Sequence, residues 1–454
     1  MAIALREVMP DASGAARATL RAIEVLLAGL PARDFAVRLW DGTGLPQSRG
    51  QRARFTIVLT HPASLRRMLW PPGELTAAEA FVRGDFDVRG DLIAALGLRD
   101  RVRMDARLVA QLAPLVPGLL QRTGSPQPVE RAARLSGGKH SEARDAAAVR
   151  HHYDAGNDFY ALWLDEHMVY SCAYFERADA TIDEAQAAKL DLVCRKLRLA
   201  RGERFLDIGC GWGGLILHAA ERYGVSAVGL TLSPQQAELA RERIRARGLA
   251  RRCRVELVDY RELREEPFDK IASVGMVEHV GVERLGEYFH HAARLLRPGG
   301  LFLNHGIAPV SPRDNGFRSS LLRQGRFLQR YVFPDAELPF LHETAEAAME
   351  AGLELRDVES LREHYALTLR RWLERLERHE AEVVREVGTT AFRIWRLYLA
   401  GAAAEFDRAG NTVYQTIYVR PVEGRSGLPL TRAGWAAPGP AAATRRRTSR
   451  RSAA

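Results

Sequence analysis

The sequence predicts an α/β protein in which a Rossmann-like, doubly wound parallel sheet follows a smaller α+β domain. Three observations support this prediction. From about residue 149 onward, short apolar runs alternate with stretches of helical periodicity, a pattern that places helices on both faces of a parallel sheet. A glycine-rich turn follows the first of these runs. The chain of 454 residues is also long enough for two or three domains with separate cores.

Composition places the chain among soluble globular proteins, with 46% hydrophobic and 27% charged residues. Its longest apolar stretches are interrupted, and none approaches the ~20 consecutive apolar residues of a membrane span. The first residues (MAIALREVMPDASG) lack the charged-then-apolar pattern of an export signal, and the four cysteines lack paired spacing. We therefore expect a cytoplasmic protein with neither a disulfide framework nor a metal site.

Five of the ten excess positive charges lie in a C-terminal run, TRRRTSRRS, and lysine accounts for only four of the 66 basic residues. Residues 423–454 are rich in Gly, Pro, Ala and Arg, so we predict a disordered basic tail. Such a tail could touch anionic lipid or nucleic acid, but a solvated charge run is the commoner case. We expect no nucleic acid partner.

Residues 1–121 are predicted to form the smaller domain. Ala15–Leu30 has apolar residues at helical spacing, Arg54–Leu59 has the character of a strand, and Gly84–Leu92 is typical of short strands joined by glycine turns. Residues 122–148 are polar, contain Gly, Pro and Ser, and show little apolar periodicity, which predicts a linker.

Residues 149–422 are predicted to form the main domain. Its candidate parallel strands are Arg204–Ile208, Ser226–Leu230, Arg254–Val258, Lys270–Val274 and Gly300–Asn304. Helical stretches separate them, such as Pro234–Arg247, which Gly248 ends. Two late strands, Leu353–Val358 and Thr412–Val419, flank a long helical block and suit an antiparallel edge of the sheet.

The run FLDIGCGWGG, from Phe205 to Gly214, is the most informative stretch of the chain. A short buried strand ends near Asp207, and three glycines then allow the backbone to turn tightly against a ligand. The helix that begins near Trp212 directs its first N–H groups into the same space. This pattern alone is a weak signal, because dinucleotide-binding folds use a similar turn.

The ends of the following strands narrow the choice of ligand. In open parallel sheets, ligands bind at the carboxyl ends of the strands. The second strand ends in Thr231-Leu232-Ser233, where a dinucleotide fold would usually supply an acidic ribose ligand. After the third strand come Asp259-Tyr260-Arg261, which could bind an adenine amino group and flank its ring. These ends favour S-adenosylmethionine over a nicotinamide cofactor.

Seven motifs then occur in a characteristic order over residues 150–420. They are HYDAGNDFYALWLDEHMVYSCAYF (His152 to Phe175), LDIGCGWGG, GLTLSPQQ, VGMVEHVG, FLNHGIAP, RYVFPDAELP and HYALTLRRW. In these motifs the sequence resembles the cyclopropane-fatty-acyl-phospholipid synthase family, which includes the mycolic acid cyclopropane synthases and relatives that form 10-methylene fatty acids. The resemblance implies a class I S-adenosylmethionine methyltransferase sheet with a helical cap. The N-terminal region is similar to the small lipid-binding domain of the phospholipid-acting members.

The resemblance also implies roles for individual residues. The cofactor S-adenosyl-L-methionine would be contacted by Tyr170, Ser171, Asp207, Gly209, Gly211, Gly213, Thr231, Leu232, Gln236, Tyr260 and Arg261. A bicarbonate ion would lie near the catalytic residues Cys172, Glu278, His305, Ile307 and Tyr365, with Tyr153 close by.

The implied reaction explains why such groups are needed. Methyl transfer to a cis double bond leaves a carbocation on the acyl chain, and loss of a proton from the new methyl group closes a cyclopropane ring. Water must be excluded, and Tyr365 and Tyr153 could stabilise the cation. Bicarbonate held by His305 and Glu278 would be the base. Cys172 has no recognisable nucleophile motif around it, so we interpret it as a wall of the pocket.

Several alternatives stay open at this point. A hydride shift before deprotonation would give a methylene branch, which a partner reductase would convert to a 10-methyl chain. Gly306 follows His305 where many relatives carry a larger residue, which would widen the pocket or change where the proton is lost. A small-molecule methyltransferase on the same fold is a second enzymatic alternative. A non-catalytic lipid- or nucleic-acid-binding protein is the third.

The expected partner is membrane phospholipid at the bilayer surface. We expect the N-terminal domain and apolar residues such as Trp70 to dock the protein peripherally on the inner face of the membrane. Related bacterial enzymes suggest a homodimer.

Overall fold

The computed structural model describes most of the chain. The described residues are 13–102, 106–115, 127–133, 135–153, 155–310 and 325–432. The arginine-rich run predicted as a basic tail lies outside them. The chain separates into two compact units, which we describe one at a time. The first unit comprises Met1–Trp163, Pro309–Leu338 and Arg362–Thr412, and the second comprises Leu164–Ala308, Pro339–Leu361 and Val413–Ala454.

The second unit is built on a seven-stranded sheet with the strand order β10-β11-β9-β8-β5-β6-β7. Its strands are β5 (Arg204–Ile208), β6 (Ser226–Thr231), β7 (Cys253–Leu257), β8 (Phe268–Val274), β9 (Leu296–Pro309), β10 (Glu354–Ser360) and β11 (Asn411–Val419). β5 pairs in parallel with β6 and β8, β6 with β7, and β8 with β9, whereas β10 and β11 are antiparallel. The predicted parallel sheet with an antiparallel edge is confirmed.

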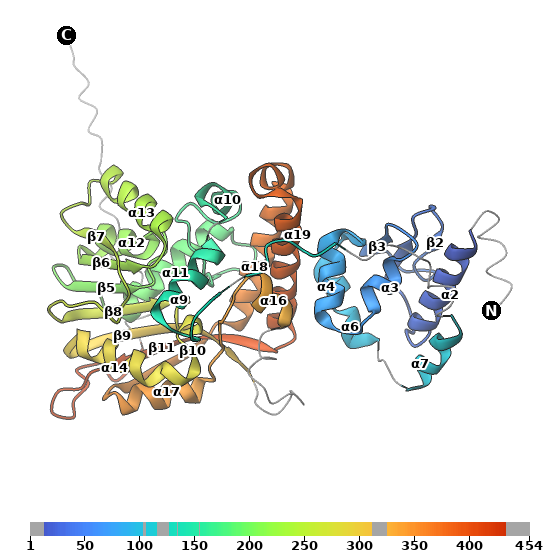
Figure 1. Ribbon diagram of the computed structural model, residues 1–454. Coiled ribbons are helices and arrows are strands. Elements are labelled where there is room, and N and C mark those ends of the chain that lie inside the picture. The colour runs from blue at the N-terminus through green and yellow to red at the C-terminus, as the bar shows by residue number, and fades with distance from the viewer. Residues whose placement is uncertain are drawn as a thin grey trace, which may run out of the picture. The chain divides into compact units, whose positions relative to one another are not determined.

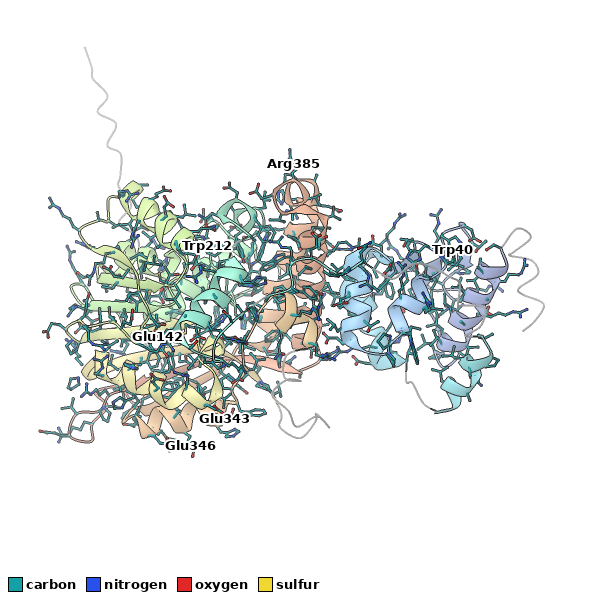
Figure 2. All side chains as sticks on the ribbon, in the orientation of Figure 1. Trp40, Glu142, Trp212, Glu343, Glu346 and Arg385 are labelled. Carbon is teal, nitrogen blue, oxygen red and sulfur yellow. The ribbon has the colours of Figure 1, made fainter. Side chains whose placement is uncertain are left out.

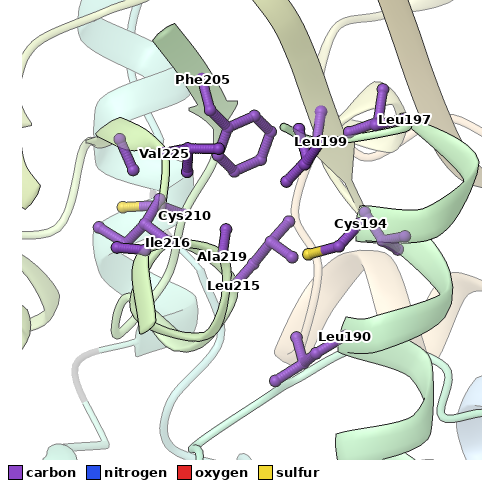
Figure 3. Close-up of a cluster of buried hydrophobic side chains, with 14 of the residues drawn as sticks. Leu190, Cys194, Leu197, Leu199, Phe205, Cys210, Leu215, Ile216, Ala219 and Val225 are labelled. Atoms are coloured by element: carbon purple, nitrogen blue, oxygen red, sulfur yellow. The ribbon is translucent and has the colours of Figure 1, made fainter. Parts of the chain in front are cut away.

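Helices cover both faces of this sheet (Figure 1). On one face lie α11 (Ile182–Lys196), α12 (Gly214–Tyr223) and α13 (Pro234–Ala246), and on the other lie α14 (Leu285–Leu295) and α17 (Leu341–Glu350). Figure 3 shows part of the core under the first group, where Phe205 of β5 packs with Leu215 of α12 and Cys194 of α11. Two apolar layers therefore hold the sheet between them.

Alternation along the strands decides which side chains meet α11. Phe205 belongs to the core on the α11 side, and Leu206 and Ile208 belong to the opposite core. Because successive side chains of a strand point to opposite faces, Asp207 lies on the side of Phe205 and α11. The same alternation in β9 and β11 places His305 and Gln415 on this side. Polar groups from three strands thus gather under one helix.

The carboxyl end of β5 lies where the strand order reverses. The chain continues from β5 outward to β6 and β7, and later returns to the other side of β5 as β8 and β9. In open parallel sheets, ligands bind at such a switch point, outside the carboxyl ends of the strands, and we refer to this expected ligand region as the crevice. Three turns or loops border it, those that follow β5, β6 and β8.

The first unit begins with a small four-stranded sheet of order β2-β1-β3-β4. Its strands are β1 (Phe35–Arg38), β2 (Gly44–Leu45), β3 (Phe55–Leu59) and β4 (Phe86–Gly90), and its helices are α2 (Gly14–Leu27), α3 (Ser64–Leu69), α4 (Glu74–Arg83), α5 (Leu92–Leu96), α6 (Leu98–Arg101) and α7 (Ala106–Leu112). The expectation of short strands joined by glycine turns in Gly84–Leu92 is wrong, because residues 86–90 form one strand that pairs along the whole of β3.

The rest of the first unit is helical. Its helices are α9 (Glu142–Tyr153), α10 (Asn157–Ala161), α16 (Arg326–Tyr331), α18 (Arg362–Arg378) and α19 (Glu380–Asp407), the last kinked at Gly388. α9 begins within the predicted linker 122–148. Among the residues that the structure describes, no helix is both long and apolar enough to cross a membrane.

Two arginines of α19 join it to the N-terminal sheet. Arg393 donates from Nη2 to the carbonyl of Phe86 at 2.8 Å, and Arg396 donates from Nη2 to the carbonyl of Val88 at 2.9 Å. These contacts explain why the compact unit extends past residue 121. The functional boundary predicted there stays a prediction.

Candidate active site

The glycine turn after β5 borders the crevice expected at the strand ends. Gly209, Gly211 and Gly213 have φ values of 84°, 53° and 80°, a left-handed region that glycine adopts without strain. A Cβ atom on Gly209 would lie 3.1 Å from Cγ of Met276, so a larger residue would require the Met276 side chain to shift. Trp212, labelled in Figure 2, is buried within the turn. The turn leads into α12, whose first N–H groups have no intrahelical partner.

The turn after β6 is held by its own side chains. The Thr231 hydroxyl donates to Oε1 of Gln236 at 2.7 Å, and both side chains are buried. Ser233 caps α13 by accepting the N–H of Gln236 at 3.3 Å. Leu232 is only partly buried. The predicted cofactor residues of this turn therefore have fixed positions at the edge of the crevice.

The loop after β7 carries a closely bonded ion pair. Arg261 donates from Nε and Nη2 to the two carboxylate oxygens of Asp259, at 2.9 and 2.6 Å. The Arg261 guanidinium also lies 5.6 Å from the centroid of the Tyr260 ring. Asp259 thus orients Arg261 and, through it, supports Tyr260. A direct contact of either residue with a cofactor stays a prediction.

Glu278 lies in a short turn directly after β8 and reaches toward β9. Its Oε1 accepts the backbone N–H of Ile307 at 2.7 Å. Its Oε2 is buried and has no hydrogen-bond partner among the described residues. Burial raises the pKa of Glu278 to about 7. The structure therefore brings together two predicted site residues, Glu278 and Ile307, and leaves one buried carboxyl oxygen without a partner among the described residues.

His305 is buried near the carboxyl end of β9, next to β8. Its Nδ1 lies 3.1 Å from Nε2 of Gln415, and its own Nε2 is buried without a partner among the described residues. Burial, together with the nearby positive charges of Lys189 and Lys196, holds the pKa of His305 well below its usual range. The imidazole is therefore neutral at physiological pH.

Cys172 and Ser171 belong to a segment that α11 holds in place. The buried Cys172 thiol donates to the carbonyl of Leu361, with an Sγ–O distance of 3.7 Å. This contact fits a wall of the pocket better than a nucleophile, which needs an adjacent base. Ser171 accepts from Nζ of Lys189 at 2.9 Å, and its carbonyl accepts from Gln186 at 2.8 Å. Tyr170, the preceding residue, is partly buried.

Sequence reasoning missed Lys189, Lys196 and Gln415. Both lysines are 2% exposed, and they are seven residues apart on α11, which places them on the same face of the helix. Lys189 also faces Asp207: burial raises the pKa of this carboxyl and lowers that of the lysine, while their opposite charges oppose both shifts. The rarity of lysine and this helical spacing were the available signals.

Tyr153 and Tyr365 belong to the first unit. The Tyr365 ring is buried, with its centroid 4.7 Å from that of Phe406, and the Tyr153 ring lies 5.8 Å from that of Tyr160. Their predicted place beside Glu278 and His305 stays a prediction.

Comparison with known proteins places these features in context. Residues 140–416 match the family model described as mycolic acid cyclopropane synthetase. A probable fatty acid methyltransferase of Pseudomonas putida is 40% identical over 400 residues, which cover 87% of this chain and 94% of that protein. The cyclopropane-fatty-acyl-phospholipid synthase of Escherichia coli strain K12 is 36% identical over 292 residues, which cover 64% of this chain and 72% of that protein.

A solved structure is similar to this chain in both fold and sequence. It is the crystal structure of mycolic acid cyclopropane synthase CmaA1 complexed with SAH and CTAB. It shares 37% sequence identity with this chain at a TM-score of 0.57, and the match covers 60% of this chain and 97% of that one.

Proposed function

The chain belongs to the mycolic acid cyclopropane synthetase family, as its motifs predicted, and from this premise we propose that it methylates the cis double bond of an unsaturated phospholipid acyl chain and closes a cyclopropane ring. It is an S-adenosylmethionine-dependent methyltransferase of the cyclopropane synthase type, with the class I fold of that group. The alkene electrons form one new C–C bond to the methyl carbon as its C–S bond breaks, which leaves a carbocation on the chain. Loss of a proton from the new methyl group to a base then lets the C–H electrons form the second C–C bond, which closes the ring.

The observation that carries this proposal is that two buried polar atoms, one following β8 and one on β9, lack a hydrogen-bond partner among the described residues. They are Oε2 of Glu278 and Nε2 of His305. A buried polar group without a partner costs about 1–3 kcal/mol, so each of these atoms calls for a water, an ion or a ligand beside it. A proton donor and a carboxyl group together suit a small oxyanion that carries a hydroxyl.

Bicarbonate fits this donor set. Glu278 and His305 would hold it, and when bound it would supply the base that takes the proton from the new methyl group. The protein's own residues hold the groups around it. Ile307 fixes the Glu278 carboxyl, and Cys172 closes the wall with its thiol turned to the backbone. Cys172 and Glu278 are buried, and such a setting would keep water from the carbocation.

A methylene-branched product is the second candidate. It is favoured by the Pseudomonas putida relative, which covers most of this chain and whose name is that of a fatty acid methyltransferase. The structure does not support the suggestion that Gly306 widens the pocket. A Cβ atom there would lie 2.3 Å from Cγ1 of Val277, so the Val277 side chain already fills this space. A reductase partner would be needed only for this branched product.

Purified protein incubated with S-adenosylmethionine and vesicles of cis-unsaturated phospholipid tests the proposal. We expect the acyl chains to gain one carbon and two hydrogens, as measured by lipid mass spectrometry. Unchanged acyl chains would contradict the proposal. Methylation of soluble amines with no response to vesicles would instead support a small-molecule methyltransferase.

We also propose that the N-terminal domain docks on the inner face of the membrane through the end of α3. Trp70 is 73% exposed, and it follows Leu69, another exposed apolar residue, and two arginines in the last turn of the helix. Trp70→Ala should weaken sedimentation with anionic vesicles. Met349→Ala, which removes an exposed apolar residue of α17, is the control. Equal sedimentation of both variants would contradict this docking site.

The formation of a homodimer stays a prediction.

A further inference from the structure

A buried line of side chains reaches His305 from α11. Lys196 donates from Nζ to Oε1 of Gln415 at 2.7 Å, and Nε2 of Gln415 lies 3.1 Å from Nδ1 of His305. Lys196 is 2% exposed, Gln415 is completely buried, and His305 is 1% exposed. At its outer end Lys196 pairs with Glu359 of β10, whose side chain is partly exposed.

The chemistry of these groups fixes the direction of each hydrogen bond. A lysine ammonium has three donors and no acceptor, so Gln415 must present its carbonyl oxygen to Lys196. The amide nitrogen of Gln415 then faces His305, and it can only donate. Nδ1 of His305 is therefore an acceptor. A neutral imidazole with an accepting Nδ1 carries its hydrogen on Nε2.

We propose that Lys196 is a positioning residue that acts through Gln415 to hold His305 as the Nε2–H tautomer, with this donor directed at the oxyanion of the reaction. The inference rests on the proposed function, because that function supplies the oxyanion. Nε2 is the buried atom of His305 that lacks a partner among the described residues. With the hydrogen on Nε2, it is a ready donor for a carboxylate-type oxygen.

Removal of the ammonium would release this constraint. The amide of Gln415 could then rotate and offer its oxygen to a protonated Nδ1, which would leave Nε2 with a lone pair directed at the oxyanion. Two acceptors facing each other repel, so the oxyanion would be lost from the site. A purely structural ion pair between Lys196 and Glu359 would have no such effect on His305.

Histidine ¹⁵N chemical shifts measured on the protein without ligands test the tautomer directly. The His305 signals are assigned by their loss in His305→Gln. We expect a protonated Nε2 and a bare Nδ1 in the wild type, and at least partial transfer of the hydrogen to Nδ1 in Lys196→Met. Lys196→Arg, which keeps a donor, should retain the wild-type pattern. Lys270→Met is the matched control, because Lys270 is another buried lysine paired with a glutamate, at 3.7 Å from Glu203.

A protonated Nδ1 in the wild type would overturn the inference, even if Lys196→Met fails to fold. An unchanged Nε2–H pattern in folded Lys196→Met would overturn it as well. In activity assays, the bicarbonate concentration that gives half of the full rate should rise about tenfold or more in Lys196→Met, but stay unchanged in Lys270→Met. Failure of lipid methylation in the wild type with an intact Nε2–H tautomer would contradict the proposed function and leave the tautomer assignment standing.

Discussion

Glu278 carries an enclosed carboxyl group whose Oε1 accepts the N–H of Ile307. Its position at the end of a strand was readable from the sequence, as was that of His305, because both follow apolar runs in a parallel sheet. The partners of His305 were not readable. Gln415 and Lys196 are 219 positions apart, and only the folded sheet and helix bring them into contact.

The carboxyl of Glu278 should make stability depend on pH. Its pKa of about 7 lies above the value of 4.5 for a free glutamate, so the folded state binds this proton more tightly. The free energy of unfolding therefore falls as the pH rises from about 4.5 to about 7, and this residue adds no further change above that. Glu278→Gln, which keeps an acceptor for Ile307, should remove this loss.

Denaturant unfolding at pH 5 and pH 8 measures the effect. The free energy of unfolding of Glu278→Gln, taken relative to that of the wild type, should be higher at pH 8 than at pH 5 by on the order of 1–3 kcal/mol. Glu346→Gln is the control, because Glu346 is an exposed glutamate of α17 that Figure 2 labels. A lower free energy of unfolding of Glu278→Gln relative to the wild type at pH 8 than at pH 5 would contradict the prediction, because it would show that the protein stabilises the Glu278 carboxylate.

Gly306 and Val277 should behave as a coupled pair. A Cβ atom on Gly306 would lie 2.3 Å from Cγ1 of Val277, a distance at which the valine must move. We expect Gly306→Ala to lose about 1–3 kcal/mol of stability through overpacking. Val277→Ala in the same chain should recover most of this loss. Additive effects of the two substitutions in unfolding experiments would rule out the contact.

At the scale of elements, α11 links several parts of the crevice. The bounds of the strands against which α11 packs were predicted to within a few residues, because apolar runs followed by glycine residues mark the ends of strands. The functional face of α11 was not predicted, since a lysine in an amphipathic helix normally lies at the surface. Here both lysines are buried. Lys189 donates a hydrogen bond to Ser171 and is attracted by the carboxyl group of Asp207, whereas Lys196 donates a hydrogen bond to Gln415.

Lys189 should support cofactor binding through the segment that contains Ser171. Its ammonium donates to the Ser171 hydroxyl and offsets the negative charge of the buried Asp207. Lys189→Met removes both effects, so we expect S-adenosylhomocysteine to bind about tenfold more weakly or worse in calorimetry, with Lys270→Met close to the wild type. Equal affinities for the two variants would mean that Lys189 has only a packing role.

At the scale of the whole molecule, the compact units combine segments that are distant in sequence. The first unit joins the N-terminal sheet to α18 and α19. The boundary near residue 121 was predicted from a local change in the polarity of the sequence. Local polarity contains no information on contacts with distant residues, such as the hydrogen bonds that arginines of α19, more than 300 positions away, donate to the carbonyls of Phe86 and Val88.

These arginine contacts should protect β4 from hydrogen exchange. The double variant Arg393→Met, Arg396→Met removes the donors to Phe86 and Val88, so the amides of residues 86–90 should exchange faster. Arg385→Met, at an exposed position of α19 labelled in Figure 2, should leave them unchanged. Unaltered exchange in the double variant would mean that apolar packing alone holds this sheet.

Methyl transfer to an acyl chain is the central claim, and isotopic tracing tests it most directly. The protein is given S-adenosylmethionine labelled with ¹³C in its methyl group, bicarbonate, and vesicles of cis-unsaturated phospholipid, and the extracted lipid is analysed by ¹³C NMR. We predict that the label appears in the CH₂ of a cyclopropane ring within the acyl chain. A label that remains in the cofactor, or that enters the lipid headgroup, would contradict the account.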